Sequence, residues 1–129
     1  MAKIKRFEDI EAWKKARRLV ADIYSLTEDG SFTRDFGLRD QIRRASISIM
    51  LNIAEGFARR TDRQFSHFLS LAHGSVAEVQ SALYVALDQE YVDKEAFDRL
   101  FQECDEISRM ISGLIKYLRG SRGPRLSDR

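Results

Sequence analysis

Histidine and cysteine, which often act as metal ligands or nucleophiles, are sparse in this chain and poorly placed for either role. The two histidines, His67 and His73, are six residues apart, about 120° from each other around a helix, and no Glu-x-x-His pair occurs. The single cysteine, Cys104, falls on an apolar helical row, where a thiol behaves as a small hydrophobic group. The isolated glycines form no phosphate-binding loop. The sequence therefore predicts no enzyme activity, no metal, no cofactor and no small-molecule substrate.

Arginine is the one chemically suggestive residue type, because it gathers around both ends of one predicted helix. The candidate nucleic-acid contacts are Arg39, Arg43, Arg59, Arg60 and Arg63. Guanidinium groups brought together can neutralise phosphates, and repetition in an oligomer would multiply the attraction. The same arginines can instead pair with the segment 61–92, whose net charge is −3. Phosphate binding and structural ion pairing both stay open.

A narrow polar strip runs along that same helix at steps of three and four residues. Its members are Gln41, Arg44, Ser48, Asn52 and Glu55. Such a strip can be solvated, or it can form hydrogen bonds between helices. It can also line a groove that contacts a ligand.

Four long helices must position these side chains, because apolar residues recur at helical spacing and the only proline is Pro124. The pattern predicts helices over residues 8–28, 38–56, 61–89 and 94–119. Thr61 and Gln64 form a capping-box pattern at the third start. Short connections predict an all-α, antiparallel, up-down-up-down four-helix bundle.

Each predicted helix has one row expected in the core. The four rows are Trp13, Ala16, Val20, Tyr24 and Thr27; Leu38, Ile42, Ala45, Ile49 and Ile53; Phe65, Phe68, Leu69, Ala72, Val76, Val79, Leu83 and Leu87; and Phe97, Leu100, Cys104, Ile107, Ile111, Leu114 and Leu118. The last row alternates steps of three and four, as in coiled-coil packing.

The second helix carries a further apolar row on another face, which a surface helix should lack. This row is Ile47, Met50, Leu51 and Ala54, and the third helix offers small residues that include Ser70 and Gly74. A single four-helix domain has no extra layer to cover such a row. These six residues are therefore the expected interface of a homo-oligomer, with an unusually central helix as the alternative.

Length and composition fit one globular domain. The 129 residues have a net charge of +2, and 120–129 is a basic stretch without apolar periodicity. We expect a bundle domain over 1–119 and a mobile basic tail over 120–129. The absence of a signal-like or membrane-spanning apolar run, together with the single cysteine, predicts a cytoplasmic protein that does not contact membranes.

The stretch from Gln41 to Ile49, continued by 52–56 and Arg59, resembles the hallmark of the 23S rRNA intervening-sequence protein family, also called the four-helix bundle protein family. Supporting matches lie at 7–10, 36–38 and 72–75, so that the resemblance covers about residues 7–118. One departure is Met50-Leu51, where relatives often have Pro-Ser. Loss of that proline should straighten the helix and make its outer face more apolar.

The resemblance implies a bacterial protein that forms a bundle and assembles into a ring of five subunits. The chain is distantly similar to the accessory variability proteins of diversity-generating retroelements, a pentameric branch that binds a reverse transcriptase and nucleic acid through basic surfaces. The family has no settled biochemical role. The favoured hypothesis is therefore a ring-like scaffold that binds RNA or a ribonucleoprotein. The alternative is an oligomer that only contacts proteins, with no nucleic-acid binding.

Overall fold

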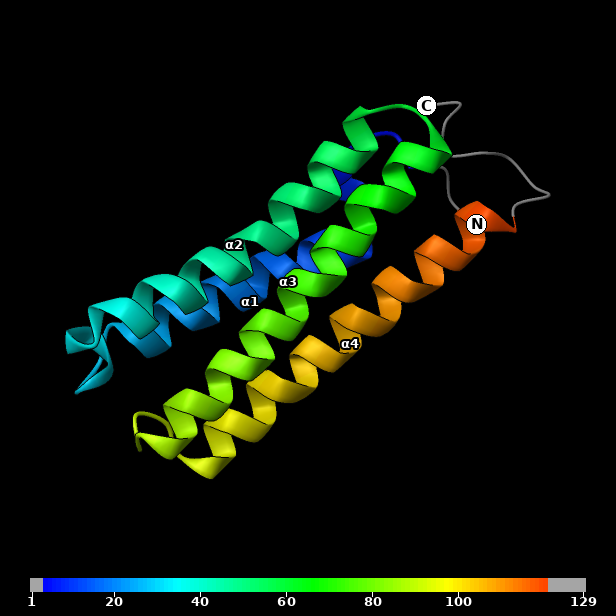
Figure 1. Cartoon of the computed structure of the whole chain (residues 1–129). Coiled ribbons are helices and arrows are strands. Elements are labelled where there is room, and N and C mark those ends of the chain that lie inside the picture. The colour runs from blue at the N-terminus through cyan, green and yellow to red at the C-terminus, as the bar shows by residue number, and fades with distance from the viewer. Residues whose placement is uncertain (1–3, 121–129) are drawn as a thin grey trace.

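The computed structural model describes residues 4–120, which fold into helices joined by short connections (Figure 1). The four α-helices are α1 (Glu11–Thr27), α2 (Phe36–Ala58), α3 (Asp62–Asp88) and α4 (Lys94–Arg119). Two 3₁₀ helices, η1 (Phe7–Asp9) and η2 (Phe32–Arg34), precede α1 and α2. No β-strand occurs within residues 4–120, so the all-α four-helix class is confirmed. The predicted mobile tail lies outside the described residues, apart from Gly120.

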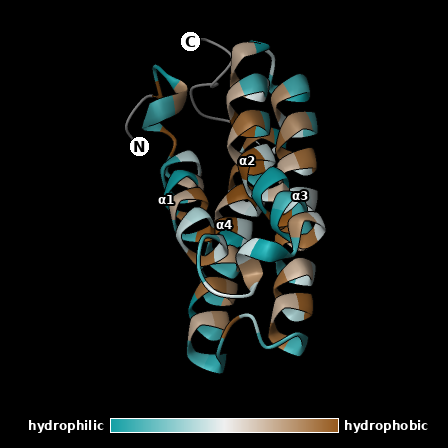
Figure 2. Ribbon diagram, turned by 90° about the vertical axis from the view of Figure 1, so that its left-hand side faces the viewer, coloured by the Kyte–Doolittle hydropathy of each residue, from teal (hydrophilic) through white to brown (hydrophobic). Residues whose placement is uncertain are grey.

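Each helix packs against two others, and the contact between α2 and α3 is the most extensive. Figure 1 shows that consecutive helices run in opposite directions, so the starts of α1 and α3 lie at the same end as the C-termini of α2 and α4. Hydrophilic and hydrophobic residues alternate along each helix (Figure 2). No helix within residues 4–120 combines the length and hydropathy that a membrane span requires.

The predicted core rows of α2, α3 and α4 are largely confirmed. Ile42, Ile49 and Ile53 of α2 are fully buried. The same holds for the central residues of the other two rows, among them Phe65, Leu69, Leu83, Leu100, Cys104 and Ile111. Leu38, Phe68, Leu87 and Leu114 are only half-buried, because they lie at the margins of their helical faces.

The predicted core row of α1 is wrong by about one position. The buried residues are Ala12, Ala16, Leu19, Ile23 and Thr27, so only two of the five predicted residues are buried. Trp13, Val20 and Tyr24 are half-buried. Their helical phase places them on the side of α1 that carries Thr27 and faces α2. There the bulky side chains cover the edge of the contact between α1 and α2 and do not enter the centre of the core.

The helix starts are fixed by side-chain caps. Thr61 Oγ1 accepts a 3.2 Å hydrogen bond from the amide of Gln64, as predicted. The Gln64 side chain, expected to accept from the Thr61 amide, instead accepts a 3.4 Å hydrogen bond from the Thr61 hydroxyl. Asp35 caps α2 and Asp93 caps α4 through amides three residues ahead. The first α-helix begins later than predicted because η1 comes first, held by Asp9.

Gly56 allows the close approach of α2 and α3. A Cβ atom there would lie 2.7 Å from Phe68 Cβ and 3.0 Å from Phe65 Cδ1. It would also lie 3.2 Å from the Phe65 carbonyl oxygen, which belongs to rigid helical backbone. A larger side chain at residue 56 would therefore push the two helices apart.

Candidate nucleic-acid interface

The five candidate arginines do not share one surface. Arg39 lies in the first turn of α2 and contacts nearby residues. Its Nε is 3.2 Å from Asp40 Oδ1, and its Nη1 donates a 3.1 Å hydrogen bond to the Thr33 carbonyl. The guanidinium also lies 4.8 Å from the centroid of the Phe36 ring. These contacts fix the connection before α2 and leave Arg39 far from the other end of the helix.

Arg43 is turned toward α1. Its Nε donates a 2.8 Å hydrogen bond to Thr27 Oγ1, and its guanidinium lies 4.3 Å from the centroid of the Tyr24 ring. Thr27 is fully buried, and its hydroxyl donates in turn to the Ile23 carbonyl at 2.7 Å. Arg43 therefore joins α2 to α1, and its Nε is engaged within the protein.

Arg59, Arg60 and Arg63 lie together at the connection between α2 and α3. Arg59 Nε is 3.0 Å from Glu55 Oε2, and the guanidinium lies 5.0 Å from the centroid of the Phe68 ring. Arg60 adopts a positive φ of 69° in the turn, and Arg63 is exposed on the first turn of α3. All three residues are exposed, so this part of the arginine set faces solvent.

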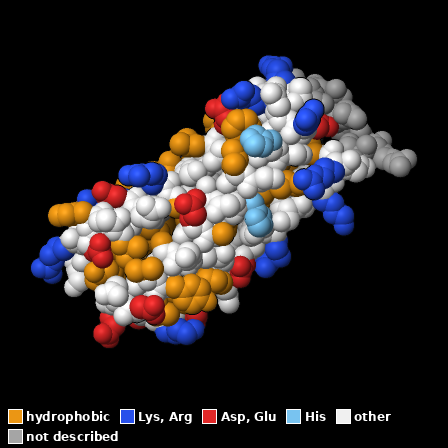
Figure 3. Space-filling model, in the orientation of Figure 1, with side chains coloured by type: hydrophobic (Ala, Val, Ile, Leu, Met, Phe, Trp, Pro, Cys, Tyr) orange, Lys and Arg blue, Asp and Glu red, His pale blue; other side chains and the backbone are white. Residues whose placement is uncertain are grey.

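The last turn of α4 adds Lys116 and Arg119 to the same end of the bundle, where Figure 3 shows several Lys and Arg side chains. We call this the basic end and define it by the segments 4–15, 55–63 and 109–120. It carries ten Lys and Arg residues against five Asp and Glu residues. The sequence pattern did not single out Lys116 and Arg119, although cations in the last turn before Gly120 are a recognisable helix-end signal.

The opposite end has the reverse charge. We call it the acidic end and define it by the segments 28–40 and 88–99, which carry nine Asp and Glu residues against four Lys and Arg residues. The bundle is therefore electrically polarised along its length, although the whole chain has a net charge of only +2. Only the fold reveals this, since each end is assembled from segments far apart in the sequence.

The polar strip of α2 divides into two parts. Ser48 and Asn52 are half-buried against α3, where Ser75 Oγ lies 2.9 Å from Ser48 Oγ and Asn52 Nδ2 donates to the Ser48 carbonyl at 2.9 Å. These two residues take part in hydrogen bonds within and between helices. The other members, Gln41, Arg44 and Glu55, are exposed.

The six predicted interface residues lie on outer faces of α2 and α3. Leu51 is 62% exposed, and Ile47, Met50 and Ala54 beside it are half-buried. On α3, Ser70 and Gly74 are exposed, and a Cβ atom at Gly74 would meet nothing within 4 Å. Both faces are accessible to another molecule.

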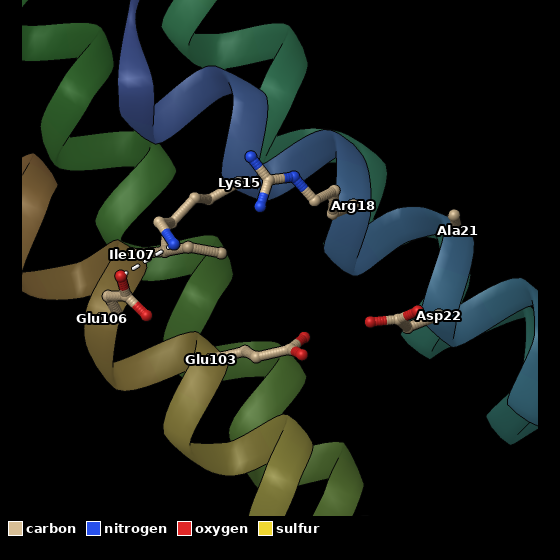
Figure 4. Close-up of a pocket in the computed structure, with 7 residues that line it drawn as sticks. All are labelled: Lys15, Arg18, Ala21, Asp22, Glu103, Glu106 and Ile107. Atoms are coloured by element: carbon tan, nitrogen blue, oxygen red, sulfur yellow. Dashed lines mark ion pairs between the residues drawn. The ribbon is translucent and has the colours of Figure 1, made fainter.

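A groove of about 320 Å³ lies between α1 and α4 (Figure 4). The carboxylates of Asp22 and Glu103 point toward each other across it, and Arg99 lies 3.8 Å from the first and 3.9 Å from the second. Burial, followed by the charge of Asp22, raises the pKa of Glu103 above its usual 4.5. Lys15 Nζ of α1 is 2.8 Å from Glu106 Oε1 of α4 in the same groove. The groove walls thus combine ion pairs of Lys15 and Arg99 with one pair of like charges, Asp22 and Glu103.

The cysteine and the two histidines make contacts within the protein. Cys104 is buried, and burial raises the pKa of its thiol to about 12, which keeps it protonated and unreactive. His73 Nε2 is 2.7 Å from Ser108 Oγ, and the ring of His67 contacts Phe68 edge-on. Within residues 4–120, no group of three or more His, Cys, Asp or Glu residues is arranged to hold a metal ion.

Comparison with known proteins identifies relatives of this fold. Residues 8–113 match the model of the family described as 23S rRNA-intervening sequence protein. A crystal structure of a protein of unknown function from the S23 ribosomal protein family of Bacteroides thetaiotaomicron superposes with a TM-score of 0.74. The two sequences are 22% identical, and the match covers 81% of this chain and 98% of the other. None of the curated proteins matches the chain.

Proposed function

The chain belongs to the 23S rRNA-intervening sequence protein family, and we propose that it is a non-enzymatic, self-associating scaffold that binds RNA or a ribonucleoprotein through its basic end. The observation that carries this proposal is the segregation of charge along the bundle. Ten cationic residues gather where α1 and α3 begin and where α2 and α4 finish. An evenly mixed surface would offer a polyanion no such site.

The basic end has the chemistry that a phosphate backbone requires. Arg59, Arg60 and Arg63 are exposed, and Lys116 and Arg119 extend the same cationic surface from α4. Contacts of this kind neutralise phosphates without reading bases, so the binding is largely independent of sequence. We expect structured RNA to be bound by backbone charge and shape.

Self-association is proposed from the outer faces of α2 and α3. Leu51 exposes 62% of its surface within a row of apolar neighbours, whereas the face around Gly74 is lined by small residues. The two faces belong to different helices. When the α2 face of one copy contacts the α3 face of the next in one direction only, the contact is heterologous, and its repetition closes into a ring when the rotation permits. The family resemblance favours five subunits. A ring would place several basic ends together.

The alternative function is an oligomer that contacts only proteins. Arg39 and Arg43 favour it, because their guanidinium groups make contacts inside the protein. The two functions differ in whether the basic end binds RNA in solution.

An anisotropy titration with a structured RNA at low salt distinguishes them. The test variant is Arg59→Gln/Arg60→Asn/Arg63→Gln, in which asparagine suits the positive φ at residue 60. The matched control is Arg34→Gln/Arg44→Gln/Lys94→Gln, which removes the same charge from exposed positions outside the basic end. We expect the test variant to lose most of the affinity and the control to retain it. Equal losses, or no binding by the wild type, would favour the protein-only alternative.

A further inference from the structure

An aromatic cluster lies near the acidic end, on the side where α3 meets α4, with Tyr84 exposed, Phe101 half-buried and Phe97 buried beneath them. Tyr84 is 52% exposed, and its ring lies 5.0 Å from the centroid of Phe97 and 5.5 Å from that of Phe101. The neighbouring Val85 is 44% exposed. Figure 3 shows hydrophobic side chains gathered on this half of the molecule, with acidic side chains around them. We call Tyr84, Val85, Phe97 and Phe101 the aromatic patch.

The charges around the aromatic patch are mostly negative. Residues 84–105 contain seven Asp and Glu residues and two Lys and Arg residues. Both cations are already paired, because Lys94 Nζ is 2.6 Å from Asp98 and Arg99 lies near Asp22 and Glu103. The surface therefore repels phosphate groups and attracts cations.

The protein itself shows how a cation fits here. Lys94 Nζ lies 5.9 Å from the centroid of the Phe97 ring while Asp98 holds it in place. On α3, the exposed Tyr84 is followed one helical turn later by Asp88, so a ring and a carboxylate share one helix face. No hydrogen bond or cation contact involving the Tyr84 side chain is observed within residues 4–120. An incoming guanidinium could stack on the Tyr84 ring with Asp88 beside it.

We propose that the aromatic patch is a docking surface for an arginine-rich segment of a partner protein. Arginine is preferred to lysine because its planar guanidinium stacks on aromatic rings and forms paired hydrogen bonds with carboxylates. Val85 supplies apolar contact for the aliphatic part of such a segment. This inference does not rest on nucleic-acid binding, since it concerns the opposite charge and the opposite half of the bundle.

The probe is a fluorescein-labelled peptide of six Gly-Arg repeats, titrated by anisotropy against the full chain at low salt. A peptide of Gly-Lys repeats measures the contribution of positive charge alone, and a peptide of Gly-Glu repeats measures non-specific adhesion. Tyr84→Ala should weaken Gly-Arg binding by at least about threefold, the effect of a partly exposed cation–π contact, and Tyr84→Phe should retain it. Asp88→Asn should weaken it as well.

Leu71→Ala is the matched control, because Leu71 is 45% exposed on α3 but lies about 20 Å along the helix from Tyr84. Circular dichroism verifies that every variant is folded, and light scattering verifies that its molar mass is unchanged. Three results would overturn the proposal: equal affinity of the Tyr84→Ala and Leu71→Ala proteins, equal binding of the arginine and lysine peptides, or a molar mass that changes in Tyr84→Ala. The last result would identify the patch as a contact between copies of this chain.

Discussion

Arg43 Nε donates a 2.8 Å hydrogen bond to the hydroxyl of Thr27, a side chain that is completely buried in α1. The guanidinium also stacks on Tyr24, so one arginine of α2 contacts α1 through a polar and an aromatic partner. An arginine predicted to contact nucleic acid is thereby part of the framework that joins two helices.

Replacement of Arg43 should therefore change stability and leave nucleic-acid affinity nearly unaltered. We expect Arg43→Ala to lower the free energy of unfolding by about 1–3 kcal/mol, because a hydrogen bond to a charged group is lost. Urea unfolding followed by circular dichroism measures this. Arg44→Ala is the control, since its side chain is exposed, and its effect should stay within about 0.5 kcal/mol. A stable Arg43→Ala protein with weakened RNA binding would contradict the structural role.

Gly56→Ala should destabilise the bundle through overpacking. The added methyl group would lie 2.7 Å from Phe68 Cβ and 3.2 Å from the Phe65 carbonyl oxygen, and overpacking of this kind typically lowers stability by about 1–3 kcal/mol. Gly113→Ala is the matched control, because its new methyl group would meet nothing within 4 Å. The control should be neutral or more stable by up to about 1 kcal/mol, from the higher helix propensity of alanine. Thermal unfolding of both variants decides the point, and similar melting temperatures would refute the close approach.

Two glutamates in the groove between α1 and α4, Glu103 and Glu106, should make the stability of the protein depend on pH in opposite ways. Burial and Asp22 raise the pKa of Glu103, so the folded protein holds this proton more tightly than the unfolded chain does. Its stabilising contribution is present in acid and is lost as pH rises from about 4.5 through the raised pKa. Lys15 lowers the pKa of Glu106, whose contribution is present above 4.5 and is lost as pH falls.

Glu103→Gln should therefore be more stable than the wild type at pH 7, and this advantage should shrink in acid. Glu106→Gln should be less stable at pH 7, and its deficit should also shrink in acid. Urea unfolding at a series of pH values measures both. If Glu103→Gln were less stable than the wild type at pH 7, the proposed conflict between Asp22 and Glu103, with Arg99 and Lys15 nearby, would be wrong.

Leu51→Arg should separate subunits without unfolding them. The side chain is 62% exposed in the single chain, so arginine is tolerated there, whereas a charge buried at a subunit interface without a partner weakens association by about 3–5 kcal/mol. Light scattering should give an oligomer for the wild type and a mass near 14.9 kDa for the variant. A wild type that is monomeric at micromolar concentration would end the proposal of a ring.

Much of the fold was predictable because the core rows of α2, α3 and α4 have strong helical periodicity. In α1 the helical spacing of Trp13 and Tyr24 fits a core row, yet amphipathic rings often lie at the edge of a helix–helix contact, and here Leu19 and Ile23 occupy the centre. The hydrogen bond of Arg43 could not be predicted from the spacing of residues, because it depends on how α1 packs against α2 and brings Thr27 close to Arg43. The basic end likewise depends on which distant segments the fold brings together.

The central claim is that the basic end binds a phosphate backbone, and the salt dependence of RNA affinity tests it most directly. The logarithm of affinity should fall with the logarithm of salt concentration by about 0.7–0.9 for each phosphate that is neutralised. We predict that Arg59→Gln/Arg60→Asn/Arg63→Gln lowers this slope by at least about two, whereas Arg34→Gln/Arg44→Gln/Lys94→Gln leaves it unchanged. Identical slopes for the wild type and both triple variants would contradict the account.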